Sequence, residues 1–210
     1  MRLVFVSALA ATICACNGQS FSLGVVGGVR LTDDMTGNTT SESKRYTLGP
    51  MIDVGLPHRL GIEVDALYRR QGFAFFGPAT VPLWERERAN SWEVPILLKY
   101  RLASAGVKPF VEAGYAPRVL NGAIDYSSPC LAGSVPCDVP YHLHTGIAGN
   151  TSQGLVVGGG VQFAAGPLRF SPQLRYTHWN NAAIGPPAGF PVQSAQNQAD
   201  VLVGIGWKAH

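Results

Sequence analysis

The segment Trp92-Glu93-Val94-Pro95-Ile96-Leu97-Leu98-Lys99-Tyr100 places an apolar or aromatic side chain at every second position. An extended chain points successive side chains to opposite faces, so this period of two predicts a β-strand. One face carries Trp92, Val94, Ile96, Leu98 and Tyr100, and the other carries Glu93 and Lys99. We therefore expect a strand with an apolar environment on one side and a polar environment on the other.

Seven further segments show the same alternation. Each is about as long as the 9 to 11 residues that a tilted strand needs to cross a lipid bilayer. Together with the first segment they predict eight strands, at residues 21–31, 45–56, 60–70, 90–101, 108–120, 154–164, 168–178 and 198–208.

The connections between these segments alternate strictly between short and long. Strict alternation places every short turn at one end of the sheet, together with both chain termini, and every long loop at the other end. This layout is typical of bacterial outer-membrane barrels, so we predict an all-β fold, a closed eight-stranded antiparallel up-and-down transmembrane β-barrel. The short connections are residues 57–59, 103–107 and 165–167, and the long ones are 32–44, 71–89, 121–153 and 179–197.

The composition fits one domain with many strands and turns. The 210 residues include 25 Gly and 15 Pro, and only 14% of them are charged, which favours strands and turns over helices. The formal net charge of +3 is small, and no run of Lys and Arg is present. Nucleic acid is therefore not expected as a partner, and nothing in the sequence indicates a cofactor.

Residues 1–18 are predicted to be a signal peptide and residues 19–210 the outer-membrane β-barrel domain. Arg2 supplies a positive charge, residues 3–15 form an apolar run, and Cys16-Asn17-Gly18 offers a cleavage region. The run is shorter than the ~20 apolar residues of a membrane-spanning helix. Ile13-Cys14-Ala15-Cys16 also resembles a lipobox, so lipidation of Cys16 is an alternative.

The face that lies inside distinguishes a membrane barrel from a soluble, lipocalin-like carrier. Glycine weakens a solvent-facing strand but suits the crowded interior of a narrow barrel, so the glycine-rich face is predicted to be the inner one. The apolar face then contacts lipid. The inner glycines are Gly24, Gly28, Gly49, Gly55, Gly114, Gly158, Gly160, Gly204 and Gly206, and the outer residues include Val25, Val29, Ile52, Val54, Ile62, Val64, Val94, Ile96, Leu98, Val157, Val161, Leu174, Val201, Val203 and Ile205.

Charged and aromatic residues are distributed in a way that fits this orientation. Six acidic and six basic residues fall on the inner face, where each buried charge needs a partner: Asp53, Glu63, Asp65, Glu93, Glu112 and Asp200 with Arg30, Arg69, Lys99, Arg101, Arg169 and Arg175. Outward aromatic residues are predicted to form two girdles at the membrane interfaces. These are Phe21, Tyr100, Phe163, Phe170 and Trp207 near the short turns, and Tyr46, Tyr68, Trp92, Tyr115 and Tyr176 near the long loops.

Four segments, at residues 92–100, 108–115, 173–179 and 196–207, resemble the bacterial outer-membrane β-barrel domain family. Its wider relatives include the transmembrane half of outer-membrane protein A. The resemblance covers the mature chain and implies location in the outer membrane, a structural or surface-interaction role, and outer-membrane lipid and the barrel-assembly machinery as partners. Two features depart from the family: the chain ends in Lys208-Ala209-His210 rather than on an aromatic residue, and prolines lie inside predicted strands, where we expect bulges or shifted boundaries. These prolines are Pro50, Pro95, Pro117 and Pro172.

Three features of the predicted loops are candidate sites. Cys130 and Cys137 lie in the longest loop, and an exported protein passes through the oxidising periplasm, so a disulfide between them is predicted. His142 and His144 form a His-x-His pair that a polar loop explains as well as a metal does, and no metal site is assigned. Residues 85–88, Glu-Arg-Glu-Arg, are predicted to be a solvated, self-pairing loop segment.

The segment of residues 175–182 is similar to a strand-end motif of outer-membrane lipid A deacylases, in which a His base and a Ser nucleophile lie two residues apart. His178 matches the base, and Asn181 could match a neighbouring polar residue, but Asn180 stands at the nucleophile position. A carboxamide cannot attack an acyl group as a serine hydroxyl does. We therefore predict no enzyme and no catalytic residue, and keep a deacylase-like enzyme, a minor small-solute pore and a soluble carrier as alternatives.

Overall fold

The computed structural model describes residues 20–33, 35–36, 40–76, 84–103, 106–128, 141–182 and 193–209. No helix long and apolar enough to span a membrane occurs among these residues. The strands are β1 (Phe21–Arg30), β2 (Met35–Thr36), β3 (Thr40–Ser41), β4 (Tyr46–Gly55), β5 (Leu60–Asp65), β6 (Leu67–Phe76), β7 (Trp84–Glu93), β8 (Ile96–Arg101), β9 (Lys108–Ser128), β10 (Tyr141–Ala165), β11 (Leu168–Trp179), β12 (Gln193–Ser194) and β13 (Asn197–Ala209).

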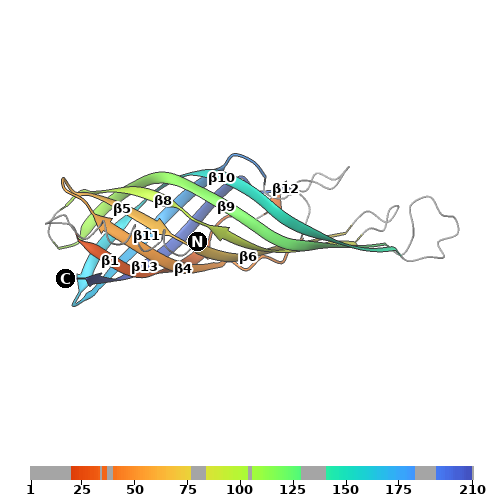
Figure 1. The fold of residues 1–210 in the computed structure, drawn as a ribbon, viewed down its shortest axis with the longest axis horizontal. Helices are drawn as coiled ribbons and strands as arrows, with labels where there is room; N and C mark the ends of the chain where they lie inside the picture. Colours follow the sequence, from red (N-terminus) through yellow and green to blue (C-terminus); the bar gives the residue numbers. More distant parts are fainter. Residues whose placement is uncertain are drawn as a thin grey trace, which may run out of the picture.

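The long strands close into an antiparallel barrel (Figure 1). Around the barrel, β1 pairs with β4, and β4 pairs with both β5 and β6. β5 then pairs with β8, β6 pairs with β7, and both β8 and β7 pair with β9. β10, β11 and β13 follow in that order. β13 pairs again with β1, from Phe21 opposite Ala209 to Arg30 opposite Asp200. Because β5 with β6 and β8 with β7 each occupy one position, the predicted closed eight-stranded barrel is confirmed.

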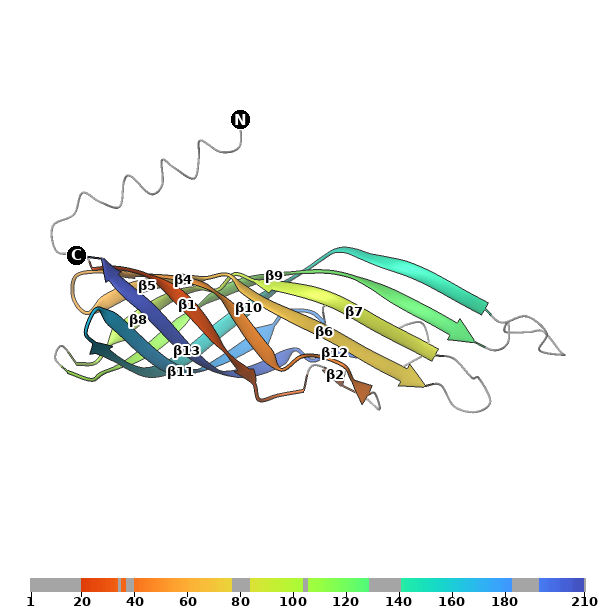
Figure 2. The same ribbon diagram turned by 90° about the horizontal axis from the view of Figure 1, so that it is seen from below.

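The short turns gather at one end of the barrel, where β1 begins and β13 ends (Figure 2). The turn between β4 and β5 places His58 and Arg59 at φ values of 61° and 67°. Two successive residues with positive φ are the mark of a type I′ turn, whose twist matches that of a hairpin. Gly106 and Gly166 take positive φ, at 64° and 62°, in the other two short connections.

Two of the four predicted long loops are wrong over much of their length. Residues 71–89 were expected to be loop, but β6 continues to Phe76 and β7 begins at Trp84. Residues 121–153 were also expected to be loop, but β9 continues to Ser128 and β10 begins at Tyr141. The alternation of apolar residues stops before these strands end, because the side chains on both faces become polar or small. The backbone hydrogen bonds between the strands continue. Figure 1 shows the four strands extending together beyond the barrel.

The prolines coincide with interruptions of the pairing, as expected. Pro95 lies in the break between β7 and β8, which faces Pro117, and Pro50 faces the break between β5 and β6. The register of β10 with β11 skips Pro172. A proline lacks an N–H but keeps its carbonyl, and three of these carbonyls still accept ladder bonds. Pro50 accepts from the Ala66 amide, Pro95 from Asp65 and Pro117 from Val94, at 3.0, 3.1 and 2.9 Å.

The two faces of the wall differ sharply in burial. In β8, Ile96 and Leu98 are 50% and 53% exposed on the outside, whereas Leu97 and Lys99 are 0% and 1% exposed on the inside. The charged side chains of the wall are thus turned inward, together with some apolar ones such as Leu97, and the outward side chains are mainly apolar. This arrangement is the reverse of that in a soluble globular protein.

Candidate functional site: the lumen, its turn-side mouth and the protruding sheet

The middle of the lumen holds five charged side chains, here called the central cluster: Glu63, Asp65, Lys99, Glu112 and Arg175. Arg175 donates to Asp65 through Nη1 at 2.8 Å, to Glu112 through Nε at 3.1 Å and to Glu63 through Nη2 at 3.2 Å. Lys99 donates to Glu63 and lies 3.5 Å from Glu112 Oε2. Two cations therefore serve three carboxylates, all buried.

A second group of charges, the loop-side cluster, lies toward the long hairpins: Arg30, Arg69, Glu93, Arg118 and Asp200. Arg69 donates to Asp200 at 3.0 Å, and Arg30 lies 3.7 Å from Glu93 and 3.8 Å from Asp200. The amide of Gln198 donates to both carboxylates of this cluster. The cluster carries one more cation than anion, the opposite imbalance from the central cluster.

Arg118 and Trp179 are lumen residues that the sequence reasoning missed. Arg118 is 1% exposed and its guanidinium lies 3.9 Å from the centroid of the buried Trp179 ring, within cation–π range. Trp179 was expected to begin a loop but ends β11. Arg118 is therefore a further buried cation beside the six that the sequence predicts for the inner face. Counting every second residue onward from Glu112 and Arg175 would have found both.

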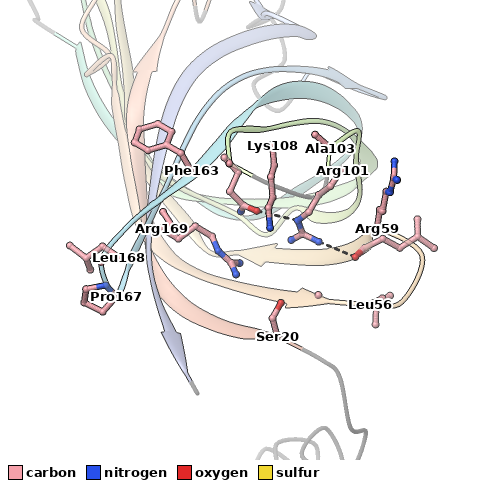
Figure 3. Close-up of a pocket in the computed structure, with 16 residues that line it drawn as sticks. Ser20, Leu56, Arg59, Arg101, Ala103, Lys108, Phe163, Pro167, Leu168 and Arg169 are labelled. Atoms are coloured by element: carbon pink, nitrogen blue, oxygen red, sulfur yellow. Dashed lines mark hydrogen bonds between the residues drawn. The ribbon is translucent and has the colours of Figure 1, made fainter.

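The turn-side mouth of the lumen holds the third group, the turn-side cluster of Asp53, Arg101 and Arg169. Arg101 Nη2 donates to both oxygens of Asp53, at 2.7 and 3.0 Å, and Arg169 Nη1 donates to Oδ1 at 3.3 Å. Arg101 is held further by Gln162 Oε1 at 3.1 Å and by the Leu60 carbonyl at 2.9 Å (Figure 3). Asp53 is buried, whereas the two arginine side chains are 11% and 13% exposed.

The aromatic residues predicted for the girdles all lie exposed or half-buried on the outer surface. On the turn side, Phe163 and Phe170 stack with ring centroids 5.6 Å apart, and Trp207 is 58% exposed. On the loop side, the Tyr68 and Trp92 rings lie 5.3 Å apart. Phe21 and Tyr100 join the first group, and Tyr46, Tyr115 and Tyr176 the second.

Beyond the barrel, β6, β7, β9 and β10 continue as a protruding sheet with two different edges. The β6 edge is covered by β3 and by backbone bonds from Glu42 and Lys44. The β10 edge lacks such a cover in the described chain, because β11 pairs with β10 only from Gly154 onward. Residues 141–152 of β10 thus pair with β9 alone, and the Asn180 side chain caps this open stretch by accepting from the Gln153 amide at 3.0 Å.

Neither the family comparison nor the comparison with curated proteins finds a match to this sequence. Solved structures do match. A major outer-membrane protein from Thermus thermophilus superposes with a TM-score of 0.52 at 12% identity, over 92% of this chain and 100% of that one. The chain has the fold of the small outer-membrane β-barrels.

Two other outer-membrane barrels match less closely in shape. Neisserial surface protein A gives a TM-score of 0.48 at 15% identity, over 92% of this chain and all of that one. Ail, the attachment invasion locus protein of Yersinia pestis, gives 0.45 at 13% identity, over 91% of this chain and 97% of that one. At such identities the likeness extends to the fold alone.

The deacylase-like segment is held in structural contacts. His178 is exposed and its Nδ1 lies 2.8 Å from Asn197 Oδ1, a neutral partner. Asn180, at the position of the nucleophile, accepts a hydrogen bond from the Gln153 amide. Asn181 is exposed beside it. None of the described residues 178–182 carries the hydroxyl or thiol that an acyl nucleophile needs.

The remaining predicted sites fall on or beyond the protruding sheet. Cys130, Cys137 and the signal peptide of residues 1–18 lie outside the described residues. His142 and His144 are exposed on β10, with His144 Nδ1 2.5 Å from Asp125 Oδ1. The segment of residues 85–88 is not a self-pairing loop but part of β7, and Arg86 donates to Glu42 at 2.8 Å. The sheet brings these partners together because β3 lies along β6 next to β7.

Proposed function

We propose that this chain is an integral protein of the outer membrane, exported through its signal peptide, whose barrel supports a sheet for interaction at the cell surface. The membrane location is supported by the outer face of the wall, where apolar side chains are exposed on strand after strand. Monomeric soluble proteins rarely expose a contiguous apolar patch of more than a few hundred Å². A bilayer makes such a belt favourable.

The filled lumen argues against a wide diffusion channel. Eight strands enclose a space that side chains can fill, and here three charged clusters occupy it at successive levels. The single side chain of Arg175, on β11, donates to carboxylates on both β5 and β9, so it crosses the interior. We therefore assign the barrel a supporting role.

The open edge of β10 is the observation that carries the surface role. Natural sheets protect exposed edges with charges, proline or a covering segment, yet residues 141–153 include no Lys, Arg, Asp, Glu or Pro. β10 has 25 residues, more than twice the about 9 to 11 that a tilted strand needs to cross a bilayer. The unpaired stretch thus lies beyond the membrane, where an extended segment of another protein can add to it as a further strand.

Cell fractionation tests the membrane location. The protein is expected in the outer-membrane fraction, and its gel mobility should differ between unboiled and boiled samples, because a closed barrel resists unfolding by detergent. Recovery in the soluble fraction, with one mobility for both samples, would refute it and favour a carrier. Because the lumen is filled, we also expect the protein to show no ion conductance in planar bilayers.

Peptide selection tests the open edge. Peptides that bind the folded barrel would be selected from a random library and measured against two lysine variants. Thr145→Lys places a charge on the open edge, whereas Asn121→Lys places one on β9, which is paired on both sides. Both positions are exposed. Binding should fall at least about tenfold for Thr145→Lys only, which corresponds to about 1.4 kcal/mol. Equal effects of the two variants would refute strand addition.

A further inference from the structure

A pocket of about 310 Å³ opens at the turn-side mouth of the barrel. It is lined by the three short turns and by the strand ends that they join (Figure 3). Its volume falls at the lower limit of the roughly 300–1,000 Å³ that is usual for small-molecule sites. The pocket lies away from the protruding sheet and plays no part in the surface role proposed above.

The pocket is strongly basic. Figure 3 shows Arg101, Arg169 and Lys108 directed toward its centre from β8, β11 and β9. Lys108 pairs in register with Gln162, the residue that holds Arg101, and residues paired across strands point to the same face. Arg59 lies on the rim, where it donates to the Leu102 carbonyl at 3.2 Å. Asp53 is the acidic residue in contact with these cations.

The charges of this pocket are only partly neutralised within the protein. Asp53 balances one of the two arginines that it contacts, and within the described chain the Lys108 ammonium has no hydrogen-bond or ion-pair partner. Two positive charges therefore remain at the pocket centre. Gly61 leaves room for the Arg101 guanidinium, since a Cβ there would lie 2.5 Å from Arg101 Nη1.

We propose that this pocket binds a phosphate monoester or inorganic phosphate. Such a group carries about −1.5 to −2 charges at neutral pH, which matches the remaining charge better than a carboxylate does. Arginine side chains recognise phosphate oxygens through directed N–H donors, and lysine acts as a point charge. The phosphate can come from a soluble compound on the turn side or from a lipid headgroup of the adjacent leaflet. Only the lipid source rests on the proposed membrane location.

Titration calorimetry of inorganic phosphate into the barrel, folded in a phosphate-free maltoside detergent, tests the site directly. Lys108→Met removes the unpaired cation and leaves the Asp53 pairs intact. Lys44→Met removes an exposed lysine at the opposite end of the barrel and serves as the charge-matched control. A charge-assisted contact contributes enough that Lys108→Met should weaken binding at least about tenfold, whereas Lys44→Met should bind as the wild type does. Heat-dependent gel mobility verifies that each variant is folded.

Native mass spectrometry separates the two sources. Retention of phosphatidic acid over phosphatidylcholine, lost in Lys108→Met, would assign the phosphate to a lipid even if free phosphate does not bind. Binding of free phosphate alone would assign it to a soluble compound. If wild type and Lys108→Met behave alike toward both ligands, the proposal is wrong. Neither experiment requires the outer-membrane location, so failure here leaves the fractionation result standing.

Discussion

Replacing Arg175 with methionine should destabilise the barrel by several kcal/mol while keeping a side chain of similar length. The Arg175 side chain is 2% exposed, and its guanidinium donates to three carboxylates at 2.8 to 3.2 Å. Its removal leaves Glu63, Asp65 and Glu112 with Lys99 alone. A buried ion pair that loses one partner costs about 3–5 kcal/mol. Because the three contacts share one side chain, their losses do not add, and we expect about 3–5 kcal/mol in total.

Urea-induced unfolding from lipid vesicles, followed by tryptophan fluorescence, measures this change as a difference in unfolding free energy. Arg45→Met is the control, since Arg45 and its partner Asp33 are 65% and 76% exposed, and such a surface pair contributes about 0–1 kcal/mol.

A compensating variant separates charge from packing. Adding Glu63→Gln and Asp65→Asn to Arg175→Met leaves Lys99 facing Glu112, a balanced pair. If unpaired charge is the cause, these two changes should restore at least half of the lost free energy. A loss below about 1 kcal/mol for Arg175→Met, or no recovery in the triple variant, would refute the reasoning and indicate a lumen in which water screens the charges.

Three further predictions test other parts of the wall. Gly49→Ala should cost about 1–3 kcal/mol of unfolding free energy, because a Cβ at Gly49 would lie 1.8 Å from the Ala66 carbonyl oxygen, whereas Gly146→Ala, with no atom within 4 Å, should be nearly neutral. In the type I′ turn, His58→Asn with Arg59→Gly should raise the unfolding free energy by about 0.5–1 kcal/mol, and a decrease would contradict the turn assignment. In variants that keep one tryptophan, brominated lipid should quench the fluorescence of Trp207, which is 58% exposed, but not that of Trp179, which is 0% exposed. The reverse result would mean that the inner and outer faces of the wall are exchanged.

The parity of the strands made most of the barrel predictable. Since Ile96 and Lys99 fall on opposite faces, counting in steps of two assigns every residue of β8 to the inner or the outer face. The alternating lengths of the connections predict the topology. The predicted strand of residues 168–178 ends one residue before Trp179. Arg118 lies inside the predicted strand of residues 108–120, at an inner-face position, but is absent from the predicted lumen charges. The protruding sheet could not be predicted in this way, because its sequence, with residues such as Gly146 and Asn150, shows no alternation of apolar residues.

The turn-side pocket could not have been found from the sequence. Arg169 is far from Arg101 and Lys108 in the chain, and the three residues lie on three different strands. Alternation can place each of them inside, but it does not give the level at which each side chain lies or which partner it reaches. Only the register of the paired strands brings them to one mouth, where Lys108 has no carboxylate partner among the residues that the structure describes.

The pairing of β1 with β13 also has a consequence for the order of folding. Phe21 lies opposite Ala209, so the first strand of the barrel meets the last, and the ring cannot close until nearly the entire chain has left the ribosome. Every earlier intermediate presents unpaired strand edges and apolar side chains, both of which promote aggregation. Contacts between residues so distant in sequence also form slowly. We expect spontaneous refolding to be slow and dependent on protein concentration, and the cell to need assistance that keeps the chain unpaired until its last strand arrives.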